Sequence, residues 1–206
     1  MPFDLWITFV ATCFVILIIP GPTILLVMSY ALTQGRRVAV GMALGVALGD
    51  FIAMTASLLG LGALVLASAT LFTALKWVGA AYLVYLGIKL LRAPPMAIRI
   101  SDPSPKPVGA IFAHAAGVTA LNPKSIAFFI AFVPHFISTD AGLAPQFVVL
   151  IATFVGMAGV NALVYALLAD HLRSRIRRPG VLKWMNRAGG GALITMGALT
   201  ATMARS

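Results

Sequence analysis

The stretch IIPGPTILLV, Ile18 to Val27, places Pro20, Gly21 and Pro22 inside a run that carries no charged side chain from Leu5 to Gly35. Proline removes a backbone hydrogen bond and clashes with the preceding turn, which costs about 3 kcal/mol inside a helix. Within a lipid bilayer the freed backbone groups need partners from protein, water or a ligand. We therefore expect an interrupted membrane helix whose break offers backbone groups to a polar solute.

The composition is that of an integral membrane protein. The chain has 206 residues, of which 61% are hydrophobic and 10% are charged, and its mean hydropathy is +1.01. The net charge of +10 comes from basic residues in short loops, which points to membrane topology rather than nucleic-acid binding. The lone Cys13 excludes an internal disulfide and a cysteine-cluster metal site. The first apolar run exceeds a signal-peptide core, so we expect an uncleaved helix.

Six apolar segments are long enough to span a membrane. A helix needs about 20 apolar residues to cross a hydrocarbon core of roughly 30 Å. The segments give an all-α fold with six transmembrane helices, in a single transporter domain over residues 1–206. They run approximately over Leu5–Leu32, Val38–Leu66, Leu71–Leu91, Gly109–Pro134, Pro145–Leu168 and Ala188–Met203.

The basic residues of the loops set an orientation. They follow the first, third and fifth segments, whereas Lys76 and Arg205 lie on the other side of the membrane. By the positive-inside rule the first group is cytoplasmic, so both termini face the periplasm. The cytoplasmic group is Arg36, Arg37, Lys89, Arg92, Arg99, Lys106, Arg173, Arg175, Arg177, Arg178, Lys183 and Arg187.

A proline-rich polar linker over about 92–108 separates two halves of three helices each, at about 1–91 and 109–206. If these halves are homologous, an odd number of helices makes them inverted repeats. GAAYLVYLG from Gly79 to Gly87 and GGGALITMG from Gly189 to Gly197 carry outer glycines at the same spacing. A chance match between two glycine-rich packing helices is the alternative.

The first helix of the second half is also interrupted. It contains Asn122, Pro123 and Lys124 well inside its apolar segment. Interrupted helices at corresponding places in two inverted halves indicate the binding site of a transporter. The alternative is a pair of proline kinks that only shape the helix bundle.

Two charged residues lie deep in the expected spans. Asp50 is about 18 Å along the second helix from Val38, near the bilayer middle, where a carboxylate costs roughly 2.5 to 3.5 kcal/mol. Gly49 precedes it, at the end of a small-residue ridge. A carboxyl group that exchanges a proton there would couple transport to the proton gradient, and a structural hydrogen bond or a permanent ion pair is the alternative. Lys124 needs an anionic partner, either Asp50 or the carboxylate of a bound solute.

The remaining polar residues indicate a function less clearly. Asn161 is the counterpart of Asp50 by segment order, and its amide can hold a substrate or join helices. His114, His135 and His171 show no metal-ligand spacing, and we interpret them as loop and helix-end residues. We expect no metal site and no cofactor.

The chain is similar to the lysine exporter and homoserine/threonine exporter (LysE/RhtB) family of bacterial inner-membrane proteins. The motifs are PGP, GVALGD, KWVGAAYLVYLGIKLLR and LNPKSIAFF, and the resemblance covers nearly the whole chain. It implies proton-driven export of amino acids or close derivatives, a six-helix inverted-repeat fold and homodimers. The family motifs fall on Pro20, Gly21, Pro22, Gly49, Asp50, Asn122, Pro123 and Lys124.

The sequence can also be compared with other classes of membrane protein. An intramembrane aspartyl protease needs two carboxylates that share a proton, and only Asp50 lies within an expected span, so we expect no enzyme. An exporter of another small solute or of a metal cation could use the same fold, although one cysteine and scattered histidines suit a soft cation poorly. A passive channel would not need a titratable acid at mid-membrane. The motifs leave the solute open.

Overall fold

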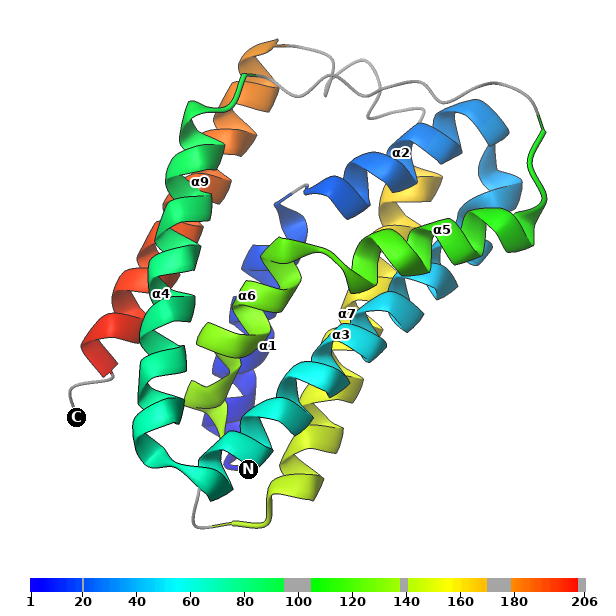
Figure 1. Cartoon of the computed structure of the whole chain (residues 1–206). Helices are drawn as coiled ribbons and strands as arrows, with labels where there is room; N and C mark the ends of the chain where they lie inside the picture. The colour runs from blue at the N-terminus through cyan, green and yellow to red at the C-terminus, as the bar shows by residue number, and fades with distance from the viewer. Residues whose placement is uncertain (20, 95–104, 138–140, 170–178, 204–206) are drawn as a thin grey trace.

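The computed structural model describes residues 1–19, 21–94, 105–137, 141–169 and 179–203. Within these ranges the chain is helical and contains no strand. The first helix begins, and the last helix ends, at the same end of the molecule (Figure 1). The helix that ends at Arg92 and the helix that begins at Pro179 have these ends toward the opposite end of the molecule.

The first apolar segment is two helices, as the PGP motif predicts. Helix α1 covers Phe3–Ile18, helix α2 covers Pro22–Gln34, and their axes differ by 55°. Pro22 occupies the first position of α2, where its missing N–H is not needed. Pro20 lies outside the described residues. Helix α2 ends at Gly35, whose φ of 75° is in the left-handed region that glycine tolerates.

The second predicted break is also present. Helix α5 covers Val108–Ala120 and helix α6 covers Pro123–Ala131, followed by a 3₁₀ turn η2 at Val133–Phe136. The side chain of Asn122 accepts a hydrogen bond of 3.1 Å from the backbone N–H of Lys124 and so caps α6. Both sequence motifs therefore end one helix and start another.

Two long helices pack together with α5. A 3₁₀ turn η1 at Arg36–Val38 leads into α3, Ala39–Ala67. Helix α3 packs against α5 and against α7, Leu143–Leu167. The predicted glycine ridge explains the close approach to α5: a Cβ on Gly45 or Gly49 would lie 2.5 Å from a backbone oxygen of α5. Small residues thus let the two backbones meet.

Helices α4, Ala69–Arg92, and α9, Pro179–Met203, form a second layer in which they run antiparallel (Figure 1). Helix α9 begins well before the expected Ala188, because polar and basic residues continue the helix beyond its apolar part. The contacts of the two helices are reciprocal. Gly87 meets the backbone of Gly190 and Ile194, and Gly197 meets the backbone of Ala80 and Val84. Positions 80, 84 and 87 thus pair with 190, 194 and 197 as two copies of one pattern.

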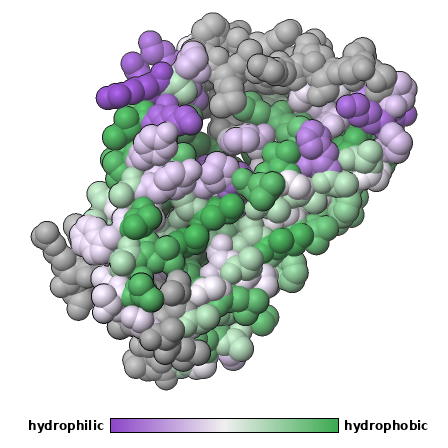
Figure 2. Space-filling model, viewed as in Figure 1, coloured by the Kyte–Doolittle hydropathy of each residue, from purple (hydrophilic) through white to green (hydrophobic). Residues whose placement is uncertain are grey.

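The helices bear out a multi-pass membrane protein. Within the described ranges, three helical stretches are long and apolar enough to cross a membrane: Arg36–Ala63, Thr73–Arg92 and Leu143–Leu167. The bent pair α1 and α2 passes the same test as one broken span, whereas α5 is shorter and apolar. The six crossings that the sequence predicts remain a prediction. Apolar side chains also dominate much of the molecular surface in Figure 2.

Candidate functional site

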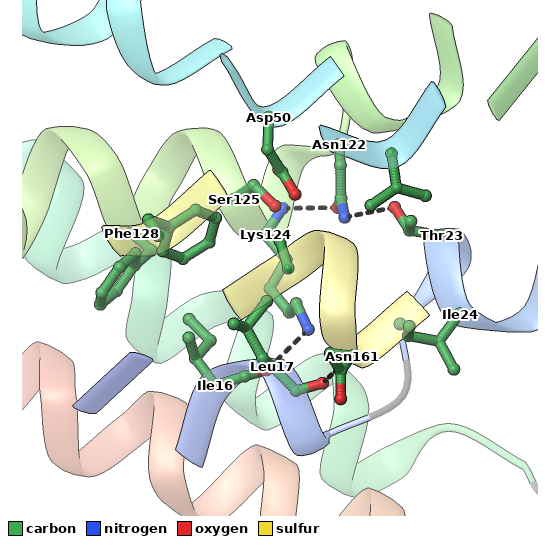
Figure 3. Close-up of a pocket in the computed structure, with 14 residues that line it drawn as sticks. Ile16, Leu17, Thr23, Ile24, Asp50, Asn122, Lys124, Ser125, Phe128 and Asn161 are labelled. Atoms are coloured by element: carbon green, nitrogen blue, oxygen red, sulfur yellow. Dashed lines mark hydrogen bonds between the residues drawn. The ribbon is translucent and has the colours of Figure 1, made fainter. Parts of the chain in front are cut away.

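A small cavity, lined by apolar residues and several polar side chains, lies between the two helix breaks (Figure 3). Its volume is about 30 Å³, which is enough for about one water molecule. A solute larger than water therefore requires a more open conformation. The polar side chains that line it come from α2, α3, α6, α7 and the residue before α6: Thr23, Asp50, Asn122, Lys124, Ser125 and Asn161.

Asp50 brings a carboxyl group into this cavity from α3. The residue is 3% exposed, and its Oδ1 atom has no hydrogen-bond partner among the described residues. Ser125 lies beside the carboxyl group (Figure 3). A buried polar atom without a partner is rare in a folded protein and points to a functional role.

Lys124 reaches the opposite wall of the cavity. Its Nζ atom donates hydrogen bonds of 3.0 Å to the carbonyl oxygen of Ile16 and 2.9 Å to that of Ile19. These carbonyl groups belong to the last turn of α1 and the residue that follows it. Among the described residues Lys124 makes no hydrogen bond to Asp50, so the ion pair considered from the sequence is not formed in this conformation.

Two residues of α7 donate hydrogen bonds to carbonyl groups at the end of α1. The side-chain amide of Asn161 donates a hydrogen bond of 3.1 Å to the carbonyl of Leu17, and the Tyr165 hydroxyl donates one of 2.9 Å to that of Ile18. Carbonyl groups at a helix end lack partners within the helix. The expectation that the break leaves these groups open is therefore wrong for this conformation, because side chains of α6 and α7 occupy them.

A second network connects the two breaks directly. The side-chain amide of Asn122 donates to the Thr23 hydroxyl at 3.1 Å, and the Thr119 hydroxyl donates to the same oxygen at 3.4 Å. All three residues are buried. The start of α2 is thus tied to the junction between α5 and α6.

A larger cavity adjoins the small one on the side of α4 and α9. Its volume is about 300 Å³. Gly21, Asn122 and Lys124 line both cavities, while Pro22 and Pro123 line only the larger one. Lys89 and Ala93 of the α4 end lie on its wall, so it extends toward the basic end of the molecule.

Gly49 is the predicted site residue that lines neither cavity. A Cβ atom there would lie 2.5 Å from the carbonyl oxygen of Ala116 and 2.6 Å from Cβ of Thr119. The position therefore permits close packing of α3 on α5. Pro20 lies outside the described residues.

Sequence reasoning missed Thr23, Thr119, Ser125 and Tyr165. Thr23 and Ser125 directly follow the PGP and NPK motifs, and Tyr165 lies one helical turn after Asn161 on the same face. These positions could have been found from the spacing. Thr119 carries no such signal, because its role depends on how α5 meets α2.

One of the histidines, His114, differs from the sequence interpretation. His114 lies inside α5 and its Nδ1 atom forms a hydrogen bond of 2.8 Å with the Tyr30 hydroxyl of α2. It therefore joins two helices rather than ending one. His135 lies in η2, and His171 lies outside the described residues. Within the described ranges, no group of three metal-ligating side chains comes together.

Comparison with known proteins establishes the family. Residues 14–204 match the family model described as LysE type translocator, so the chain belongs to the LysE family of membrane transporters. It is 35% identical over 204 residues to an uncharacterized membrane protein of Vibrio cholerae, with 98% of each chain covered. No solved structure matches the chain.

Two further relatives have names that state a function. A homoserine/homoserine lactone efflux protein of Salmonella typhimurium is 32% identical over 202 residues, which cover 98% of each chain. A leucine efflux protein of Salmonella choleraesuis is 34% identical over 137 residues, which cover 66% of this chain and 64% of that protein. The resemblance expected from the sequence motifs is thereby confirmed.

Proposed function

We propose that this protein exports amino acids or close derivatives across the bacterial inner membrane and that inward movement of protons drives the export. One observation carries the proposal: Asp50 and Lys124 line one cavity between two helix breaks without pairing with each other. The names of the relatives support the class of solute, since they refer to homoserine and leucine efflux.

The charges of the site suit a zwitterion. An amino acid presents an ammonium group and a carboxylate, and the cavity offers a carboxyl group and an ammonium group of its own. Buried charges are stable only when paired or well hydrogen-bonded. Lys124 already donates to two carbonyl groups, whereas one oxygen of Asp50 has no partner among the described residues. A bound amino acid would add one positive and one negative group at once, so that every charge in the site could have a partner, which an uncharged solute could not achieve.

The larger cavity is the proposed entry path from the cytoplasm. It adjoins the candidate site and extends to Lys89 near the basic end of α4, which the positive-inside rule places in the cytoplasm. A volume of about 300 Å³ lies at the lower end of the range for small-molecule pockets. The conformation described here then corresponds to a closed central site below a cytoplasmic vestibule.

Asp50 is the proposed proton-coupling group. Export against a gradient requires a group that binds a proton from the periplasm and releases it to the cytoplasm. A buried carboxyl group with an unpartnered oxygen meets this requirement, because it can be charged when paired with a cation and neutral when the cation leaves.

The proposed architecture is six crossings in two inverted halves, with both termini in the periplasm and two copies forming a dimer. The reciprocal contacts of Gly87 and Gly197 support the repeat, because a two-fold relation exchanges their partners. The ends of the described chain lie at one end of the molecule, which fits an even number of crossings (Figure 1).

An efflux assay tests the proposal. Cells without the gene and cells that express it are loaded with radiolabelled leucine or homoserine, and the release of label is followed with and without a protonophore. Faster release that depends on the gene and on the proton gradient is expected. Gene-dependent release that the protonophore leaves unchanged would indicate a passive channel, and release of neither amino acid would refute this solute class.

A further inference from the structure

The end of α1 gathers four hydrogen-bond acceptors at one place. The carbonyl oxygens of four consecutive residues all accept bonds from side chains of other helices. A helix C-terminus also carries a partial negative charge. Together these features make the end of α1 suited to a positively charged hydrogen-bond donor. The four residues are Ile16, Leu17, Ile18 and Ile19.

The two carbonyl groups held by Lys124 select a primary ammonium group. Their distances of 3.0 and 2.9 Å from Nζ are those of direct N–H bonds. Gly21 lies beside this group, since a Cβ atom there would be in van der Waals contact with Cε and Nζ of Lys124 at 3.4 Å. A quaternary ammonium ion has the same charge but no N–H group, so it cannot form these bonds.

Asp50 gives Lys124 a second partner in the same cavity. Its buried Oδ1 atom has no hydrogen-bond partner among the described residues. If another ammonium group took the carbonyls of Ile16 and Ile19, Lys124 could turn its flexible side chain toward Asp50. Both positive groups would then have acceptors, and neither would be buried without a partner.

We propose that the carbonyl oxygens of Ile16 and Ile19 form a primary-ammonium subsite, which Lys124 fills in this structure and which the solute's ammonium group takes over. This inference rests on the proposed function and assigns the ammonium end of the solute. The ammonium group binds the end of α1, and Lys124, displaced to Asp50, is the residue that senses its arrival. The larger cavity reaches Ile19 and Lys124, so a solute in it meets the subsite.

The subsite can be tested without measuring export. In purified Lys124→Ala the carbonyl groups lose their internal donor, and methylammonium should fill the vacancy. We expect a saturable rise of the melting temperature with methylammonium chloride and none with tetramethylammonium chloride. Lys124→Met, whose side chain still fills the space, should respond to neither. Equal responses of Lys124→Ala to both cations, or no response to either, would overturn the subsite.

The wild-type protein provides a second measurement if Lys124→Ala does not fold. Propylammonium should raise its melting temperature by displacing Lys124, whereas propyltrimethylammonium should not. Equal shifts, or no shift with propylammonium, would contradict the proposal. Both measurements are independent of amino-acid efflux, so a failure of the proposed function is distinguishable from a failure of the subsite.

Discussion

Lys124 and Asp50 line the same cavity, yet the ammonium group of Lys124 binds the end of α1, and one oxygen of Asp50 has no hydrogen-bond partner in the described part of the chain. Two opposite charges in low dielectric attract each other strongly. Lys124 does not bond to Asp50 because its ammonium group donates hydrogen bonds to the carbonyl groups at the helix break. In the proposed mechanism, the broken helix thereby keeps the carboxyl group available for a proton or a cationic group.

The two prolines that begin α2 and α6 should matter for transport more than for insertion. Pro22→Ala and Pro123→Ala remove the local restriction, and alanine favours continuation of a helix through the break. We expect normal amounts of protein in the membrane and slower amino-acid efflux for both variants. Pro145→Ala, in the first turn of α7 and outside the site, is the matched control. If both site variants export amino acids at the wild-type rate, the helix breaks only shape the helix bundle and have no role in transport.

Tyr165 should stabilise the end of α1. Tyr165→Phe removes the hydroxyl that donates to Ile18 and leaves a carbonyl without that partner. A loss of about 1 kcal/mol in the free energy of unfolding is expected. Denaturant unfolding in detergent measures it, with Tyr82→Phe on the exposed face of α4 as the control. Equal stability of the two variants would show that the bond to Ile18 contributes nothing.

Gly49 should be a packing residue of the α3 and α5 interface. In Gly49→Ala the added methyl group meets backbone of α5 at 2.5 Å, and overpacking of this kind costs about 1 to 3 kcal/mol. Gly60→Ala, on the same helix with open space around it, should instead be neutral or stabilising by up to about 1 kcal/mol. Thermal unfolding compares the two. A Gly49→Ala variant as stable as Gly60→Ala would contradict the packing role.

The membrane orientation can be tested by reporter fusions. Fusions at Arg99 and Arg177 should report the cytoplasm, and a fusion at Thr139 should report the periplasm, because the basic loops remain inside. These three positions lie in connections that the sequence predicts between spans. A cytoplasmic signal at Thr139 would reverse the orientation and the direction of the proposed entry path.

The helix breaks and the inward position of Asp50 could be predicted from the sequence, because proline and buried charge have strong local signatures. The partner of Lys124 could not be predicted. A lysine in a membrane suggests an acid, whereas here it binds carbonyl groups of a helix about a hundred positions away in the chain. Gly49 was assigned to the site together with Asp50 through the family motif, but neighbouring residues on a helix point in different directions.

Asp50→Asn tests the central claim most directly. The amide is nearly isosteric with the carboxyl group but cannot exchange a proton, so the variant should be inserted normally and could still exchange solute for solute. In proteoliposomes with an imposed pH gradient, wild-type protein should accumulate labelled amino acid against its concentration gradient, and Asp50→Asn should not. Uphill transport by Asp50→Asn equal to that of the wild type would remove Asp50 from proton coupling.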